Sequence, residues 1–327
     1  MRNLINKLPE QIKHAVEIAE SANLKESTQK ILNVCVSGLG GSGIGGTIVS
    51  QLTGGDATVP VFVNKDYSLP AFVNEQTLFI ASSYSGNTEE TLYAVEKAQK
   101  SGAQIACITS GGKLKEIADE NGYNCIVIPG GYPPRSAFGY SSVQLFRLFA
   151  YYNLIPENYL EDLKKVYNHL ITNKESIISE ASSIADKLFE KIPIIYSDAS
   201  FEGIGVRFRQ QMNENSKMLC WHHVLPEMNH NELVAWAPKY PNTAVILFRN
   251  EDDFYRTQKR MEFAKGQIEN STSSFTEVWS KGDSIIERAY YLVYLGDWIS
   301  LLLAEKQGID PVEVDIIGNL KNQLADL

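Results

Sequence analysis

Short apolar segments alternate with segments of helical periodicity along the whole chain, and this alternation restricts the fold more than any other feature. Strands joined through helices pair in parallel, and the helices then cover both faces of the sheet. The sequence therefore predicts an α/β fold in two halves, each a mainly parallel sheet flanked by helices on both faces. The expected strands are residues 31–37, 59–63, 77–82, 103–109, 124–128, 192–197, 243–248 and 275–279.

The chain is long enough for two domains of ordinary size, since it has 327 residues and domains average about 150. No Gly/Ser-rich linker separates the halves, so residues 157–190 are expected to join them as one or two helices. We expect domains at 1–155 and 156–327. The other expected helices are residues 11–24, 26–32, 44–52, 88–101, 113–121, 140–152, 204–218, 254–268, a helix ending near 304, and 310–327.

Charge and composition exclude several classes of protein. The 30 Lys and Arg against 39 Asp and Glu give a net charge of −9, which argues against nucleic-acid binding through a general positive field. The most apolar stretch, residues 289–304, is interrupted by Asp297 and is short for a membrane span, so no membrane association is expected. Four cysteines without a CxxC pair favour reduced thiols and a cytoplasmic protein.

A glycine-rich segment, SGLGGSGIGG at residues 37–46, lies between a predicted strand and a predicted helix. Glycine amides and a helix N-terminus can approach an anion closely, so Gly41 and Ser42 are candidate phosphate ligands. Residues 38–43 also match the GxGxxG dinucleotide pattern, but neither Asp56 nor Asp66 clearly ends a second strand. A dinucleotide enzyme and a plain tight turn remain alternatives.

A second loop, SSYSGNTEE, follows the predicted strand 77–82 and precedes a helix. Ser83, Ser85 and Thr88 can aim hydroxyl groups at one anion, although Thr88 could instead cap the helix. Loops at the carboxyl ends of neighbouring parallel strands face one crevice. Hydroxyls and backbone amides without an obligatory lysine suit the phosphate of a small molecule.

These two loops together resemble those of a sugar isomerase (SIS) domain. Three further blocks, PPRSAFGY at 133–140, NENSK at 213–217 and EMNHNEL at 227–233, are similar to the bifunctional phosphoglucose/phosphomannose isomerases of archaea and some bacteria. The five blocks occur in the family's order, from about residue 30 to the C-terminus. The resemblance implies two tandem SIS-type domains and a cofactor-free aldose–ketose isomerase. Its substrates would be sugar phosphates: glucose 6-phosphate, and also mannose 6-phosphate, interconverted with fructose 6-phosphate through a cis-enediolate.

The same resemblance assigns catalytic roles to individual residues. Glu214 would transfer the proton between C2 and C1, and Arg135 would stabilise the enediolate. From position alone, Glu214 could be a solvated helical carboxylate paired with Lys217 or Lys187. Arg135 follows two prolines that fix the backbone, although a surface arginine in a loop is the alternative.

His230 and Lys321 would open the sugar ring, and the resemblance implies a homodimer in which His230 reaches the partner subunit's site. Lys321 could also be an exposed lysine near a helix end. His222, His223 and His230 fall within nine residues, with Glu227 and Glu232 close by in the sequence, which raises the possibility of a metal site. No HExxH or Cys/His spacing occurs, and the family's chemistry uses no metal, so none is expected.

One departure from the family pattern concerns the choice between C2 epimers. Family members that accept both epimers have a threonine near the lysine, and residues 310–321 contain none. Glucose activity is therefore a firmer expectation than mannose activity. The main alternative function is a non-catalytic sugar-phosphate sensor, and a glutamine-dependent amino-sugar synthase would need an amidotransferase domain for which no chain remains.

Overall fold

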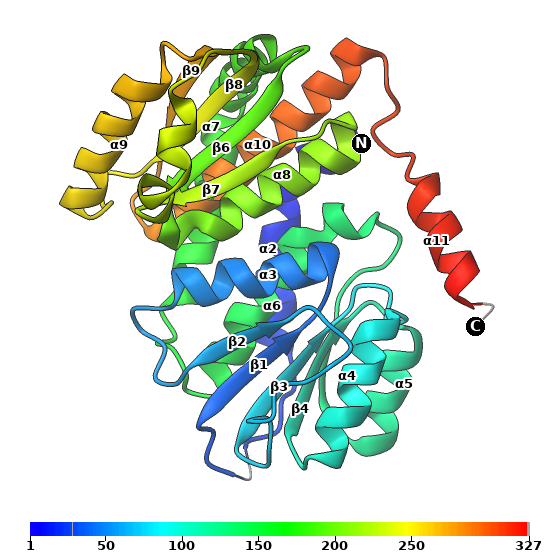
Figure 1. The fold of residues 1–327 in the computed structure, drawn as a ribbon. Coiled ribbons are helices and arrows are strands. Elements are labelled where there is room, and N and C mark those ends of the chain that lie inside the picture. The colour runs from blue at the N-terminus through cyan, green and yellow to red at the C-terminus, as the bar shows by residue number, and fades with distance from the viewer. Residues whose placement is uncertain (28, 326–327) are drawn as a thin grey trace.

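The computed structural model describes residues 1–27 and 29–325 and contains two parallel sheets, one in each half of the chain (Figure 1). The first sheet has the order β2-β1-β3-β4-β5 and the second β7-β6-β8-β9, and all their strand pairs are parallel. The predicted α/β class is confirmed. The strands are β1 Asn33–Ser37, β2 Val61–Asn64, β3 Thr77–Ser82, β4 Gln104–Thr109, β5 Asn124–Val127, β6 Ile192–Asp198, β7 Trp221–Leu225, β8 Tyr240–Arg249 and β9 Thr272–Trp279.

Strand β7 is the one that the sequence analysis missed. Its sequence, WHHVL, carries two histidines, and only its last residue is buried. It lies at the edge of the second sheet, where it pairs with β6 alone among the described strands. An edge strand can keep polar side chains, so it lacks the apolar run that marks a buried strand.

The helices cover both faces of each sheet. They are α1 Arg2–Asn6, α2 Leu8–Ser21, α3 Gly40–Leu52, α4 Glu89–Lys100, α5 Gly112–Asn121, α6 Phe138–Tyr151, α7 Tyr159–Leu188, α8 Glu202–Ser216, α9 Tyr255–Ile268, α10 Ile285–Gln307 and α11 Asp315–Ala325, with 3₁₀ turns η1 Pro134–Ala137, η2 Ala199–Phe201, η3 Glu227–His230 and η4 Glu232–Trp236.

Two predicted helices were wrong in whole or in part. The described residues of 26–32 form no helix, and the Ser27 hydroxyl lies within hydrogen-bond distance of the Gln29 carbonyl and the Gln104 side-chain oxygen, local contacts that compete with a helix. The last helix begins at Asp315 and not at residue 310. The segment before it, residues 308–314, is called the connector below, and the carbonyls of four of its residues accept hydrogen bonds from side chains elsewhere.

The two halves share one continuous apolar core. Helices α3 and α6 pack on one face of the first sheet, while α4 and α5 form a separate core on its other face. Helices α7, α8 and α10 extend the first core onto the second sheet, and α9 covers that sheet's far face. At the junction, a Cβ on Gly203 would lie 2.8 Å from Ile48 Cγ1, so glycine lets α8 pack closely on α3. The domain boundary near residue 155 stays a prediction.

The strand order identifies where the first sheet would bind a ligand, at its carboxyl edge. The chain runs from β1 outward to β2 and then returns to β3 on the other side of β1. The loops after β1 and β3 therefore diverge at the point where the strand order reverses, which is where open α/β sheets bind ligands.

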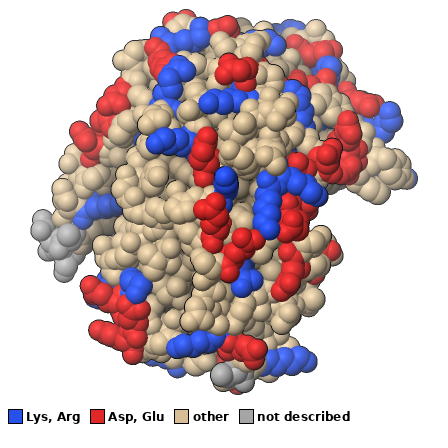
Figure 2. All heavy atoms as spheres, turned by 180° about the vertical axis from the view of Figure 1, so that it is seen from behind, with Lys and Arg blue, Asp and Glu red and all other residues tan. Residues whose placement is uncertain are grey.

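Charge is mixed on the rear face of the molecule, where Lys and Arg side chains are interspersed with Asp and Glu and form no broad basic field (Figure 2). None of the described helices is both long and apolar enough to cross a membrane.

Candidate active site

The glycine-rich loop after β1 makes a close turn into α3. A Cβ on Gly43 would lie 2.2 Å from the Gly38 carbonyl oxygen, so only glycine permits this approach. Ser42 is buried, and its hydroxyl accepts a hydrogen bond of 3.1 Å from the Tyr84 backbone amide. Ser42 thereby ties the loop after β1 to the loop after β3.

The loop after β3 brings two of the three predicted hydroxyls together. The hydroxyls of Ser83 and Thr88 lie 2.8 Å apart, and Ser83 is buried. Thr88 does not cap α4 with its side chain, which leaves its hydroxyl on the loop side. Ser85 is exposed, and its hydroxyl accepts a 3.2 Å hydrogen bond from the Asn87 amide.

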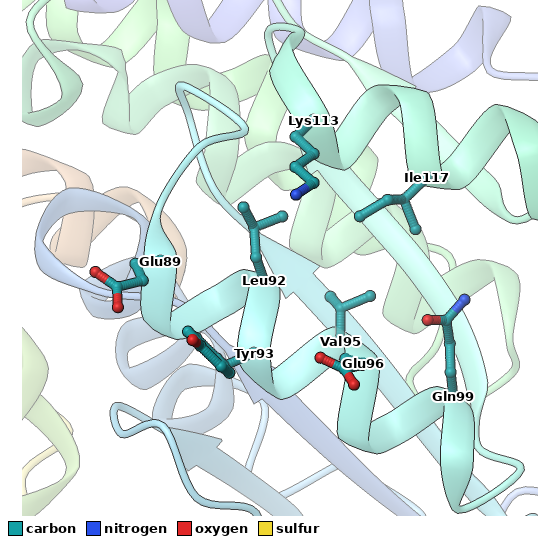
Figure 3. Close-up of a pocket in the computed structure, with 8 residues that line it drawn as sticks. All are labelled: Glu89, Leu92, Tyr93, Val95, Glu96, Gln99, Lys113 and Ile117. Atoms are coloured by element: carbon teal, nitrogen blue, oxygen red, sulfur yellow. The ribbon is translucent and has the colours of Figure 1, made fainter. Parts of the chain in front are cut away.

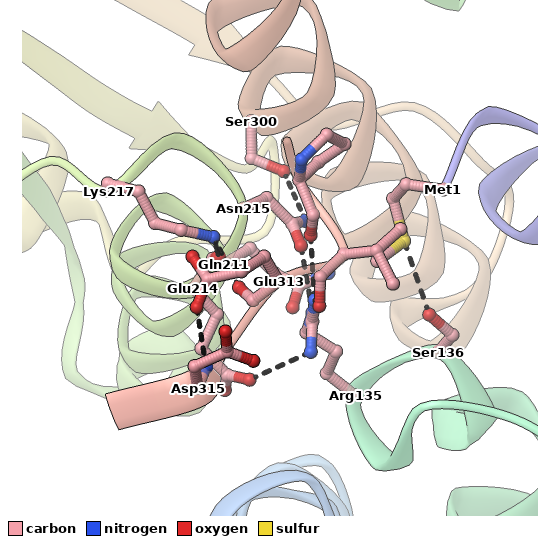
Figure 4. A network of polar contacts seen from close by, with 12 residues as sticks. Met1, Arg135, Ser136, Gln211, Glu214, Asn215, Lys217, Ser300, Glu313 and Asp315 are labelled. Carbon is pink, nitrogen blue, oxygen red and sulfur yellow. Dashed lines mark hydrogen bonds and ion pairs between the residues drawn. The ribbon is translucent and has the colours of Figure 1, made fainter. Parts of the chain in front are cut away.

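Arg135 lies buried where the two halves meet (Figure 4). Its Nε donates to Asn215 Oδ1 at 2.8 Å, and its Nη1 lies 3.2 Å from Glu214 Oε2. Its Nη2 donates to two connector carbonyls, Pro311 at 2.7 Å and Val312 at 3.2 Å. Burial lowers the pKa of Arg135 and the Glu214 carboxylate opposes this shift, but a guanidinium keeps its charge near neutral pH.

Glu214 occupies the last turn of α8, and its side chain is 29% exposed. Its carboxylate pairs with Arg135, whereas Lys217 donates to the Glu214 backbone carbonyl at 2.6 Å. The solvated pair with Lys217 or Lys187 is therefore not formed. A carboxylate and a guanidinium from opposite halves of the chain face each other beside the glycine-rich loop, since Gly41 packs on Pro134 and Arg135.

A second, deeper arginine supports this arrangement. Arg207 Nη2 donates to both oxygens of Asp297, at 3.0 and 2.8 Å, and to the Arg135 carbonyl at 3.3 Å. Gln211 donates to the same carboxylate at 2.8 Å. Burial raises the pKa of Asp297, and Arg207 opposes that rise. This buried pair fixes the backbone that carries Arg135.

His230 lies away from the Glu214 of its own chain. It follows β7 at the carboxyl edge of the second sheet, near the start of α8, whereas Glu214 is in the last turn of that helix. Twelve residues of α8 span about 18 Å. His230 itself is exposed.

Glu232 organises the segment that carries His230. Its carboxylate accepts hydrogen bonds from Trp221 Nε1 at 3.1 Å and from the hydroxyl of Tyr196, and lies 2.8 Å from His223 Nδ1. The Asn231 side-chain amide donates a 3.0 Å hydrogen bond to the Glu227 carboxylate. An exposed histidine thus projects from a well-anchored turn.

The remaining predicted groups do not converge on the Arg135–Glu214 pair. Lys321 is exposed on α11, which extends beyond the body of the fold in Figure 1. Within the described residues, no group of three or more His, Cys, Asp or Glu is placed to hold a metal ion.

Comparison with known proteins identifies the family. A model of the bacterial phospho-glucose isomerase C-terminal SIS domain matches residues 177–324. The bifunctional phosphoglucose/phosphomannose isomerase of Caldicellulosiruptor bescii is 40% identical over 98% of this chain and 97% of its own length. The chain belongs to the bifunctional phosphoglucose/phosphomannose isomerase family. The isomerase of the same name from Aquifex aeolicus is 38% identical over 88% of each chain.

Solved structures support the fold of this isomerase family member. The C-terminal domain of glucosamine-fructose-6-phosphate aminotransferase from Francisella tularensis superposes with a TM-score of 0.75, covering 95% of this chain and 97% of that one. The two sequences are 15% identical, so the likeness concerns the fold alone.

Several residues around the site of this isomerase family member were missed as functional candidates. Asn215 and Lys217 lie in the NENSK block, but only the structure shows that Asn215 holds Arg135 and that Lys217 binds the connector. Arg207 carried no signal in the sequence. Asp297 did carry a signal in the sequence, because a single acidic residue within an apolar helix needs a buried partner.

Gly41 offers a direct test of the contact between the glycine-rich loop and Arg135. In Gly41→Ala, the new Cβ would lie 3.0 Å from the Pro134 carbonyl oxygen and 3.3 Å from Arg135 Cα. We expect a shift of a few tenths of an ångström and about a 10-fold loss of kcat/KM with glucose 6-phosphate, since misplacement by 1 Å costs about 100-fold. Gly55→Ala meets nothing within 4 Å and should keep full activity. Equal kinetics for the two variants would contradict this contact.

Lys217 offers a test of the connector. It adopts a left-handed backbone conformation (φ 55°) at the end of α8, and its ammonium donates to the carbonyls of Asp310 at 3.1 Å and Glu313 at 2.7 Å. We expect Lys217→Met to loosen the connector, so that Glu-specific protease cuts after Glu313 several-fold faster, as read by intact mass. Lys239→Met, which removes one carbonyl contact near α9, should leave that cleavage rate unchanged.

Proposed function

We propose that the chain interconverts glucose 6-phosphate and mannose 6-phosphate with fructose 6-phosphate through a cis-enediolate, with the Arg135–Glu214 pair at the reacting carbons. The observation that carries this assignment is the placement of that pair at the junction of the halves, next to the glycine-rich loop. The identity to bifunctional isomerases over nearly the whole chain supports the reaction.

The phosphate group would bind at the topological switch point. Gly41 and Ser42 contribute from the start of α3, where free amides and the helix dipole favour an anion. Ser83, Ser85 and Thr88 would contribute hydroxyls from the neighbouring loop. Binding energy from this remote group would hold C1 and C2 against the reacting residues.

Proton transfer would then use Glu214 as the base. The carboxylate takes the proton from C2 of the open-chain aldose, and the electron pair moves into the C1–C2 bond as the C1 oxygen becomes negative. Arg135 stabilises this oxyanion. Glu214 returns the proton to C1 while the C2 hydroxyl proton passes to the C1 oxygen, so that C1 carries a hydroxyl and the C2 oxygen becomes the ketone. Atoms and electrons balance without any other reactant.

Ring opening requires a second set of proton donors and acceptors, for which we propose His230 and Lys321. His230 would come from a partner subunit, making the enzyme a homodimer. Two features support this: the length of α8 separates His230 from the Glu214 of its own chain, and its turn is anchored while its side chain is exposed. A cytoplasmic location, indicated by the cysteines, stays part of the proposal.

The two aldoses differ only at C2, so one base must reach a hydrogen on either face of that carbon. The connector segment without threonine contacts Arg135 through Pro311 and Val312 and is therefore our candidate for the epimer filter. A coupled assay tests the function: fructose 6-phosphate should form from both aldose phosphates. Formation from glucose 6-phosphate alone would restrict the proposed activity to that substrate, and formation from neither aldose phosphate would refute the proposal.

A further inference from the structure

Helix α11 presents an apolar stripe that no described element covers. Ile316 and Leu320 are 85% and 55% exposed, and Ile317 and Leu324 are also exposed. Residues 316, 320 and 324 are four apart, so they share one side of the helix. Contiguous apolar surface on a folded protein marks a place of interaction.

A second partly apolar surface lies along α9. A cavity of about 610 Å³ is lined by residues of α9 and of the turns η3 and η4 and is called the α9 groove here. Leu233, Tyr255 and Phe263 supply its apolar lining, and the two aromatic side chains are each 61% exposed. Asn229, next to His230, also lines the groove.

The charge at the start of α11 is opposite to that of the α9 groove. Arg256 and Arg260 line the α9 groove and form no ion pair with a described carboxylate. The connector and the first turn of α11 carry Asp310, Glu313 and Asp315. Two copies of a chain with a net charge of −9 repel each other unless surfaces of opposite sign meet.

Helix α11 cannot reach the α9 groove of its own chain. In Figure 1, α9 and α11 lie on opposite sides of the second sheet. The seven-residue connector spans at most about 25 Å, and Arg135 and Lys217 hold it at the active site. In a two-fold dimer, however, each α11 can meet the groove of the other copy.

A rival surface is the groove of about 400 Å³ between α4 and α5 (Figure 3). Leu92, Val95 and Ile117 line it, and its charged lining consists of two carboxylates, Glu89 and Glu96, against one ammonium, Lys113. These carboxylates would face the acidic start of α11, which disfavours this groove relative to the basic one on α9.

We propose that α11 of one subunit docks in the α9 groove of a second copy of this chain. The inference deepens the proposed function and rests on its dimer. Because Asn229 lines the groove, docking would bring α11, which carries Lys321, beside the partner subunit's His230. One interface would thereby hold the copies together and assemble the groups proposed for ring opening.

Disulfide trapping between chains of different mass tests this docking. A longer, tagged chain carries Leu320→Cys and an untagged chain carries Phe263→Cys; they are mixed and oxidised with copper phenanthroline. We expect a covalent heterodimer that reductant separates. The matched pair of Leu320→Cys with Tyr93→Cys, which places the second thiol in the α4–α5 groove, should give none. A heterodimer from the Tyr93 pair but not the Phe263 pair would overturn the proposal.

A second measurement does not depend on trapping. Sedimentation should show that Leu320→Glu shifts the protein from dimer to monomer, whereas Leu32→Glu, an exposed leucine just before β1, leaves the dimer intact. An unchanged dimer in Leu320→Glu would refute the docking. Glucose 6-phosphate turnover, measured on the unsubstituted protein, reports separately on the proposed function: turnover without trapping overturns the docking alone, and trapping without turnover overturns the isomerase alone.

Discussion

Replacing Glu214 by glutamine is expected to lower kcat for glucose 6-phosphate isomerisation by about 10²–10⁴-fold, the range that a general base supplies. The amide keeps the shape of the side chain and can still contact Arg135, but it cannot accept the C2 proton. Because we propose that the loops after β1 and β3 bind the phosphate, the Kd measured by calorimetry should change by less than about threefold, well under the 1.4 kcal/mol of a tenfold effect.

The matched control is Glu202→Gln at the other end of α8, where the side chain is 44% exposed. It removes the same charge from the same helix and should leave kcat unchanged. If Glu214→Gln kept wild-type turnover, Glu214 would not be the base. If the wild-type protein bound glucose 6-phosphate and never converted it, the protein would be a sugar-phosphate sensor.

Replacing Asp297 by asparagine is expected to produce the largest loss of stability. The carboxylate is buried and accepts three hydrogen bonds, two from Arg207 and one from Gln211. Without it, the Arg207 guanidinium is left buried and uncompensated, which costs about 3–5 kcal/mol. The midpoint of urea unfolding should fall accordingly, and activity should fall with it because Arg207 also holds the Arg135 carbonyl.

Two further variants isolate the cause of that loss. Glu262→Gln breaks an exposed ion pair with Lys259 and should leave the urea midpoint unchanged, because surface pairs contribute little. The double variant Asp297→Leu with Arg207→Met removes both charges and should recover most of the lost stability, without recovering activity. A midpoint for Asp297→Asn equal to that of the wild type would contradict a supporting role for this pair.

The fold could be predicted well where local pattern and tertiary environment agree. Strands β1, β3 and β4 are short apolar runs buried in the centre of a sheet, and the glycine-rich turn after β1 needs residues without Cβ atoms. Strand β7 was not predicted, because a strand at the edge of a sheet does not need the apolar run that marks a buried strand. The start of α11 was misplaced because side chains distant in sequence bind the carbonyls of residues 310–313.

The candidate site was harder to predict because its parts are far apart in the sequence. Seventy-nine residues separate Arg135 from Glu214, and no periodicity indicates that they meet; the resemblance to a known family proposed both. Neither pattern nor resemblance indicated that Asn215 would hold Arg135, since that contact depends on how α8 lies against η1. We propose that a second subunit brings His230 and Lys321 together, and this placement stays a prediction.

The most direct test of the account is a proton-NMR time course in D₂O, with glucose 6-phosphate and mannose 6-phosphate supplied separately. The account predicts that both yield fructose 6-phosphate and that deuterium enters C1 of the product, because the C2 proton passes through a carboxyl group that exchanges with solvent. Product that forms with no solvent deuterium at C1 would contradict the passage of the C2 proton through a carboxyl group that exchanges with solvent. No product from either sugar would contradict the isomerase itself.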